Sequence, residues 1–219
     1  MDLYLKDKVV LVTGGAKGIG EGIVRALAAE HAIPVIIGRS REDNEVVVKS
    51  IVEQGGKAHS IIAELADPGA CRQAVSTAAT LYNRIDAVVN NAGLNDGVGL
   101  ETGTYEEFIA SLHKSVVHYY LMAHHALPYL KLSKGTILNI TSKTAETGQG
   151  NTSGYAASNG ARNALTREWA VELAQFGIRV NAIVVAESWT PQYASWIQTL
   201  PNPEEKSKPL RNEFLWKKE

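Results

Sequence analysis

Residues 13 to 20, which decide the fold, read Thr13-Gly14-Gly15-Ala16-Lys17-Gly18-Ile19-Gly20. Before them, Val9 to Val12 is an apolar run that predicts a buried strand, and after them apolar residues recur at helical spacing from about Ile19 to Glu30. Glycines in such a turn let the backbone approach a phosphate, whose charge is stabilised by the free N–H groups and the dipole of the helix. The stretch therefore predicts a nucleotide-binding loop, and a purely structural turn is the alternative.

The rest of the chain repeats this alternation of short apolar runs and longer helical segments. Further strands are expected at about 34–37, 58–62, 87–89, 135–140 and 178–184, and helices at about 46–51, 67–82, 105–130 and 155–175. Pro128 predicts a late kink or stop in its helix, and Gly177 predicts a C-cap. Uniformly apolar strands favour a parallel sheet with helices on both faces. The sequence thus predicts a single-domain α/β fold with a doubly wound, six-stranded parallel sheet.

The alternation stops beyond Thr190-Pro191, and no seventh strand is visible. Three prolines interrupt the last segment, and from Pro203 onward more than half of the residues are charged. We therefore predict a dinucleotide-binding domain over residues 1–196 and an atypical charged tail over 197–219. A short helix at 212–218 that docks its three apolar residues on the sheet is the alternative.

Composition excludes several classes of protein. The 219 residues carry a net charge of -1, which argues against a nucleic-acid partner, and 45% of them are hydrophobic, the usual share for a globular chain. No apolar run approaches the length of a membrane span. The lone Cys71 favours a reducing, cytoplasmic location, and the histidines of the long helix lack the companions of a metal site, so no metal is expected.

Four ordered motifs, from about Lys6 to Trp196, resemble the short-chain dehydrogenase/reductase family. The first is the glycine-rich loop, and the second is Asn90-Asn91-Ala92-Gly93 after a strand. The third is Ser142 followed 13 residues later by Tyr155, and the fourth is Val180-Asn181-Ala182 followed by Thr190-Pro191. This order and spacing make the resemblance specific.

The resemblance implies a Rossmann-like fold and an oxidoreductase that moves a hydride between NAD(P) and a secondary alcohol or sugar hydroxyl. It assigns Tyr155 as the acid/base and Ser142 as the group that holds the reacting oxygen. Residues 90–100, 142–155 and 165–171 look more closely like bacterial members that oxidise sugars, of the L-fucose dehydrogenase kind. A small-molecule substrate, a sugar, is therefore expected. The long helix implies a homo-oligomer, because in this family it pairs with its copy in another subunit.

Charge at the end of the second strand predicts the cofactor. An acid there accepts hydrogen bonds from the ribose of NAD, whereas a cation accommodates the 2′-phosphate of NADP. Arg39 stands at this position and Lys17 adds a second positive group, so NADP(H) is favoured and NAD(H) is the alternative. By resemblance, the cofactor contacts are Gly14, Lys17, Gly18, Ile19, Gly20, Arg39, Glu64, Leu65, Asn91, Ala92, Gly93, Tyr155, Asn159 and Thr190.

The sequence departs from the family at two catalytic positions. A tyrosine hydroxyl has an ordinary pKa of about 10, and the family stabilises its phenolate with a lysine four residues later. That position is Asn159 here, which can hold the ribose but brings no charge. The family's helical asparagine, counted back from Pro128, corresponds to Ser115.

Two substitute cations can be considered. Lys143 is adjacent to Ser142, whereas Arg162 lies two turns beyond Tyr155 and is expected to sit too far along the axis. The chain also ends before the family's last helix and strand. Two hypotheses follow. One is an active dehydrogenase with Tyr155, Ser142, Asn159 and Ser115 in its site, and the other is a degenerate or truncated relative that keeps the fold, with little or no turnover.

Overall fold

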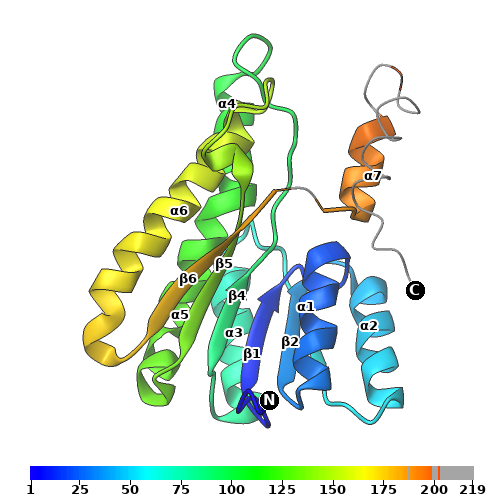
Figure 1. The fold of residues 1–219 in the computed structure, drawn as a ribbon, viewed down its shortest axis with the longest axis vertical. Coiled ribbons are helices and arrows are strands. Elements are labelled where there is room, and N and C mark those ends of the chain that lie inside the picture. Colours follow the sequence, from blue (N-terminus) through cyan, green and yellow to red (C-terminus); the bar gives the residue numbers. More distant parts are fainter. Residues whose placement is uncertain (187, 199–201, 203–219) are drawn as a thin grey trace.

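The structure is a computed structural model that describes residues 1–186, 188–198 and 202. Six strands form one parallel sheet in the order β3-β2-β1-β4-β5-β6 (Figure 1). The strands are β1 Val9–Thr13, β2 Ile33–Gly38, β3 His59–Ile62, β4 Ala87–Asn90, β5 Thr136–Ser142 and β6 Arg179–Val185. The predicted doubly wound α/β fold is therefore confirmed. The strand order reverses between β1 and β4, which is where sheets of this kind bind ligands.

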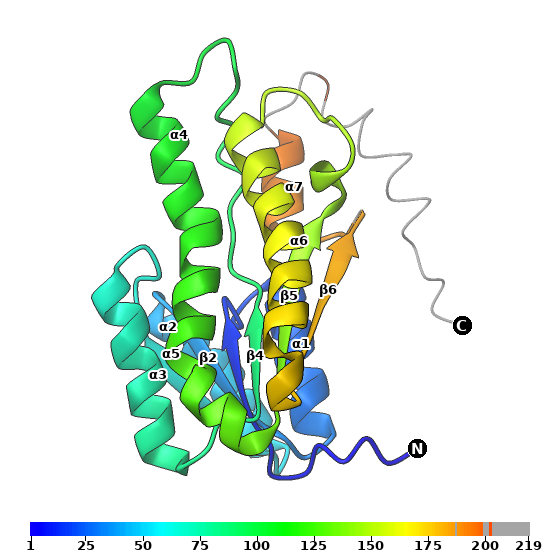
Figure 2. The same ribbon diagram turned by 90° about the vertical axis from the view of Figure 1, so that its left-hand side faces the viewer.

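Helices cover both faces of the sheet (Figures 1 and 2). One layer contains α1 Gly18–Ala29 and α2 Arg41–Glu53, and the other contains α3 Pro68–Tyr82, α5 His118–Ser133 and α6 Ser153–Leu173. Along β1, Val10 and Val12 pack toward α1 and α2, whereas Val9 and Leu11 pack toward the other layer. A strand buried on both sides must be apolar throughout, which explains the continuous apolar runs in the sequence.

Local sequence sets where several helices begin. The hydroxyl of Ser40 accepts from the N–H of Asp43 at the start of α2, and the carboxylate of Asp67 accepts from the N–H of Gly69 at the start of α3. Helix α4 Tyr105–Leu112 begins with a reciprocal capping box between Thr104 and Glu107.

The long helix differs from the single uniform helix that the sequence predicts. A π-helical segment, η1 His113–Val117, joins α4 to α5, and α5 continues to Ser133. Pro128 lies inside α5 and does not end it. The helix ends where Lys134 adopts a left-handed conformation, with φ of 49°.

Two short 3-10 segments adjoin α6. The first, η2 Lys143–Ala145, follows β5, and the second, η3 Ala174–Phe176, follows α6. Gly177, with φ of 70°, ends η3 and confirms the predicted C-cap.

The alternation of strands and helices does not stop at Thr190-Pro191 as predicted, because α7 Pro191–Gln198 follows β6. The hydroxyl of Thr190 accepts from the N–H of Tyr193, and a proline suits the first position of a helix. Ile197 is 1% exposed, so the last turn of α7 is held by packing. This helix crosses the predicted boundary between domain and tail. Most of the predicted tail, including the alternative helix at 212–218, lies outside the described residues.

Three further features bear on the kind of protein. Among the described residues, no helix has both the length and the apolar character to span a bilayer. The same part of the chain holds no group of three or more His, Cys, Asp or Glu side chains arranged to bind a metal ion. Cys71 is buried in the core, and burial raises the pKa of its thiol to about 11.

Candidate active site

The glycine-rich loop between β1 and α1 is built around close backbone contacts. Gly14 and Gly18 have positive φ angles, which favour glycine. A Cβ on Gly20 would collide with the carbonyl oxygen of Gly14, so this position also requires glycine. Asn91 holds the loop from the end of β4, because its side-chain amide donates to the carbonyl oxygens of Thr13 and Gly14, at 2.9 and 3.2 Å.

The helix that follows offers its N-terminus to a ligand. Lys17 is the N-cap residue of α1, and its side chain makes no capping hydrogen bond to the first turn. The first-turn N–H groups therefore remain uncapped by that side chain and suit an anionic group such as a pyrophosphate. Thr190, far away in the sequence, packs over this loop, since a Cβ on Gly18 would lie 3.3 Å from its side chain.

The loop after β4 is joined to the glycine-rich loop by Thr13. The hydroxyl of Thr13 accepts from the N–H groups of Asn91 and Ala92, at 2.9 and 3.0 Å. The structure thus brings together the predicted cofactor residues of the first, second and fourth motifs. Ile19 and Leu65 are partly buried, and their side chains pack against the hydrophobic core.

The two cations predicted to bind a 2′-phosphate are both paired with carboxylates. Lys17 Nζ lies 2.7 Å from an oxygen of Asp43, and Arg39 lies 3.8 Å from an oxygen of Glu64. The hydrogen bond from Lys17 lowers the pKa of the Asp43 carboxyl. Arg39, with a side chain that is 82% exposed, is free to change partner in solvent.

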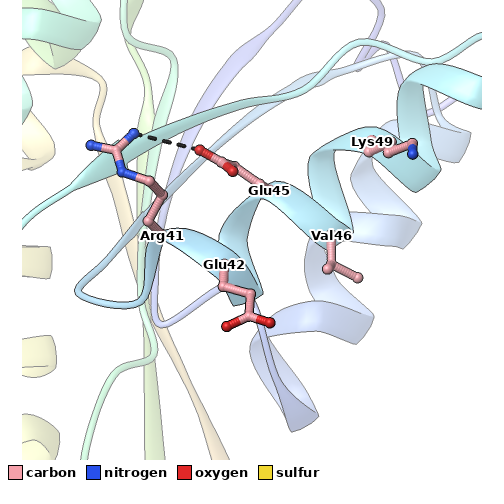
Figure 3. A pocket seen from close by; sticks show the side chains of 5 residues that line it. All are labelled: Arg41, Glu42, Glu45, Val46 and Lys49. Carbon is pink, nitrogen blue, oxygen red and sulfur yellow. Dashed lines mark hydrogen bonds and ion pairs between the residues drawn. The ribbon is translucent and has the colours of Figure 1, made fainter.

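A shallow hollow on the outer face of α2 is separate from this site. Arg41, Glu42, Glu45, Val46 and Lys49 line it, and Arg41 donates to Glu45 (Figure 3). None of these side chains belongs to the predicted site. We therefore assign the hollow to the solvated surface of α2.

Ser142 and Tyr155 lie at the same end of the sheet as the glycine-rich loop. Ser142 is the last residue of β5 and is 9% exposed, and its hydroxyl accepts from the N–H of Thr144. Tyr155 lies half-buried in the first turn of α6, which begins near the carboxyl end of β5 (Figure 2). Carboxyl ends of strands are where doubly wound sheets place their ligands.

Ser115 lies in the π-helical segment and is fully buried. Its hydroxyl donates to the carbonyl oxygen of Leu94, at 3.2 Å, and also accepts from the N–H of Leu94. These bonds hold the segment that follows β4. π-Helical turns of this kind occur frequently at functional sites.

Asn159 is fully buried, and its amide group is engaged within the protein. The Asn159 Nδ2 atom donates to the backbone oxygen of Tyr155, at 2.9 Å, and Oδ1 accepts from Arg162 Nη1, at 3.0 Å. The predicted role of Asn159 in holding a ribose stays a prediction. Sequence reasoning placed Arg162 too far along α6 to act here, yet its side chain reaches back to Asn159.

Arg162 joins the segments that carry the predicted site residues. Its guanidinium donates to the backbone oxygens of Ser115 and Ile140 and, at 3.5 Å, of Ala92. The guanidinium carbon also lies 4.3 Å from the centre of the Tyr119 ring. The sequence offered one signal for this cluster, a cation on the same face of the helix as Tyr155.

Two titratable residues of α5 pack beside Arg162. Burial, and then the nearby charge of Arg162, lowers the pKa of His118 to about 4. Burial raises the pKa of Tyr119 to about 12. His118 Nε2 lies 3.1 Å from the backbone oxygen of Ala92, whereas Nδ1 has no hydrogen-bond partner among the described residues. Both side chains are therefore neutral at ordinary pH.

The fold and the site together define a nucleotide-binding α/β protein of the dehydrogenase class. A family model described as short chain dehydrogenase matches residues 8–199. The chain belongs to the short-chain dehydrogenase family, as its motifs predicted.

Similar proteins support the finer resemblance. L-fucose dehydrogenase of Bos taurus is 32% identical over 197 residues, which cover 90% of this chain and 72% of that protein. Cyclopentanol dehydrogenase of Comamonas testosteroni is 35% identical over 192 residues, which cover 86% of this chain and 77% of that protein. The crystal structure of Cj0485 dehydrogenase is 42% identical, with a TM-score of 0.88 over 96% of this chain and 80% of that one. The predicted likeness to L-fucose dehydrogenases is confirmed.

Proposed function

We propose that the protein is an NAD(P)-dependent oxidoreductase that transfers a hydride between nicotinamide and a secondary alcohol, in particular a sugar hydroxyl. The observation that carries this proposal is the placement of three groups at one end of the sheet. These are the uncapped N-terminus of α1, Ser142 at the end of β5 and Tyr155 at the start of α6. A pyrophosphate fits the first, and a reacting hydroxyl fits the other two.

Ser142, Tyr155 and the segment after β4 have different roles in the proposed reaction. When bound, the nicotinamide supplies the hydride acceptor for alcohol oxidation. Ser142 holds the reacting oxygen, and Tyr155 receives the hydroxyl proton in oxidation and returns a proton in reduction. The Asn91 and Ala92 segment, hydrogen-bonded to Thr13, is held beside the glycine-rich loop.

NADP(H) is the cofactor that we propose, with NAD(H) as the alternative. Arg39 and Lys17 flank the end of β2 and the glycine-rich loop, and both can turn toward a 2′-phosphate. Asp43 and Glu64 compete with that phosphate for the same cations. Exposed pairs of this kind contribute about 0.2–1 kcal/mol, so exchanging a carboxylate for a phosphate has little cost.

A second candidate function is nucleotide binding with little turnover. The buried amide of Asn159 favours it, because that amide bonds to Arg162 and to the backbone of Tyr155. In this case the chain keeps the fold and the cofactor loop, while proton transfer is slow.

One experiment separates the two candidates. NADPH and NADH are titrated against the purified protein by fluorescence, and turnover is measured with L-fucose, cyclopentanol and a panel of secondary alcohols. Tyr155→Phe serves as the blank. Turnover that depends on Tyr155 supports the dehydrogenase, whereas tight cofactor binding with no turnover above the blank supports the second candidate. A preference for NADH contradicts the assignment of Arg39.

We further propose a cytoplasmic location and assembly as a homo-oligomer through the long helix. On α5, Tyr120 and Leu132 are 50% and 86% exposed, which leaves apolar surface for a second copy. Light scattering of the purified protein tests the assembly, and cell fractionation tests the location. A monomer at micromolar concentration contradicts the proposed homo-oligomer.

A further inference from the structure

One positive charge lies deep in the site with no anion beside it. Arg162 is 3% exposed, and in the described part of the chain it forms no ion pair. Its acceptors are three backbone carbonyls and the side-chain oxygen of Asn159. A guanidinium stays protonated at every pH at which proteins fold, so this charge is permanent.

Burying a charge without a counter-ion costs free energy. Carbonyl dipoles satisfy the N–H groups of a guanidinium, but they do not cancel its net charge. The backbone segments that surround Arg162 are the ends of β4 and β5 and the π-helical segment, and each carries a predicted site residue. The positive potential therefore falls on the part of the molecule where the proton transfer is proposed.

Two hydrogen bonds connect this charge to the catalytic turn of α6. Arg162 Nη1 donates to Asn159 Oδ1, at 3.0 Å, and Asn159 Nδ2 donates to the backbone oxygen of Tyr155, at 2.9 Å. Asn159 is fully buried, so the amide has no solvent to exchange with. The guanidinium thus fixes the orientation of the Asn159 amide, which in turn bonds to the backbone of Tyr155.

We propose that Arg162 is a positioning residue that supplies the buried positive charge of the site and, through Asn159, fixes the turn of α6 that carries Tyr155. This inference rests on the proposed dehydrogenase function. In alcohol oxidation the proton of the substrate hydroxyl passes to the tyrosine oxygen, while the hydride passes to the nicotinamide. A nearby positive charge stabilises the oxygen while it is negative, before the proton arrives.

Two titratable side chains near Arg162 do not change charge in the working range. His118 and Tyr119 of α5 pack against the guanidinium, and both stay neutral between about pH 5 and 10, since their pKa values lie near 4 and 12. The segment η2, which packs on α6, carries Lys143, and Glu146 after it accepts a hydrogen bond from Asn163. These groups are the same in Arg162→Met and Arg162→Lys, so a difference between the two pH profiles reports the loss of the charge at residue 162.

The test compares Arg162→Met with Arg162→Lys in the full chain. We expect Arg162→Met to lower kcat by about 10- to 100-fold and to move the rising limb of the kcat/KM profile to higher pH by about one unit. Arg162→Lys keeps the charge and should retain the wild-type profile. Fluorescence titration should give the same NADPH Kd in all three proteins, within about threefold. Equal kcat and equal profiles for Met and Lys would overturn the inference.

A second pair of variants keeps the test decisive if Arg162→Met folds poorly. Asn159→Lys places an ammonium where the amide now meets the guanidinium, so the two cations repel and kcat should fall below wild type. Asn159→Lys combined with Arg162→Met leaves one cation in the same space and should recover kcat to within about threefold of wild type. A gain in kcat from Asn159→Lys alone contradicts the inference. Absence of turnover in the wild type contradicts the proposed function instead.

Discussion

A buried charge lies at each end of the sheet, and only the one at the amino end has oppositely charged partners among the described residues. At the amino end, Asp86 is 7% exposed and accepts hydrogen bonds from Arg84, from Lys8 and from the N–H of Val9. At the carboxyl end, Arg162 is 3% exposed, and its hydrogen-bond acceptors are all neutral groups. The amino end neutralises its charge and ties β1 to the start of β4, whereas the carboxyl end keeps a charge unbalanced beside the site. The charge cluster around Asp86 and the candidate active site thus lie at opposite ends of the sheet.

The largest effect that we expect is on turnover at the carboxyl end. Tyr155→Phe removes the hydroxyl that we propose to transfer the proton, and kcat should fall by about 100- to 10,000-fold. Because Tyr155 is only half-buried, the melting temperature should change little. Tyr105→Phe is the matched control, since Tyr105 is 73% exposed at the start of α4. Steady-state kinetics with calorimetry measure both quantities, and a Tyr155→Phe protein with wild-type kcat would refute the assignment.

Next in size is the effect of Gly20→Ala on the cofactor loop. The added methyl group collides with the Gly14 carbonyl, so the loop must shift, at a cost of about 1–3 kcal/mol and with weaker NADPH binding. Gly22→Ala is the control in the same helix, where a Cβ meets nothing within 4 Å. It should stabilise α1 by about 0.5–1 kcal/mol and leave binding unchanged. Equal NADPH affinities for the two variants would contradict the geometry.

At the amino end, Asp86→Asn should affect stability and leave catalysis unchanged. Burial alone would raise the pKa of Asp86, but the hydrogen bonds from Arg84 and Val9 outweigh it, and the pKa lies below its ordinary value. The carboxylate therefore stabilises the fold above about pH 4, and this contribution is lost as the pH falls through the folded-state pKa.

We accordingly expect Asp86→Asn to reduce the free energy of unfolding by about 1–2 kcal/mol at pH 7. The difference from wild type should shrink as the pH is lowered below about 4. Urea denaturation at several pH values measures it, with the exposed Glu42→Gln as control. A difference that is constant with pH would show that Asp86 acts only by packing.

The smallest expected effect concerns the exposed pairs of the cofactor end. Asp43→Asn releases Lys17, so NADPH affinity should rise by about two- to fivefold relative to NADH, an effect that added salt weakens. Glu45→Gln, which breaks the Arg41 pair on the same helix, is the control and should leave the ratio unchanged. A fall in NADPH affinity would contradict the role of Lys17.

Sequence reasoning predicted the parts of this molecule that depend on local pattern. The six strands follow from apolar runs, and the loop from Thr13 to Gly20 from glycine spacing. Helix α7 was missed although its signals, a threonine N-cap and a proline at the first position, stand in the sequence at Thr190-Pro191.

The rest depends on tertiary geometry. The pairing of Lys17 with Asp43 needs α2 folded against the glycine-rich loop, and no spacing rule encodes it. Helix rise alone places Arg162 too far from Tyr155, but its long side chain reaches back along α6 to Asn159. The buried amide of Asn159 follows from that same reach. The catalytic roles of Ser142, Tyr155, Asn159 and Ser115 stay predictions.

The π-helical segment His113–Val117 changes which side of the long helix faces inward between α4 and α5. A π turn accommodates one more residue than an α turn, so everything after it is rotated by about 100° relative to an uninterrupted helix. The face of α4 that meets α6 therefore does not continue into the face of α5 that meets α3 and β4. Because the π turn absorbs this extra residue, deleting one residue from the segment would restore an ordinary α-helical turn and leave the inward side of α5 facing inward.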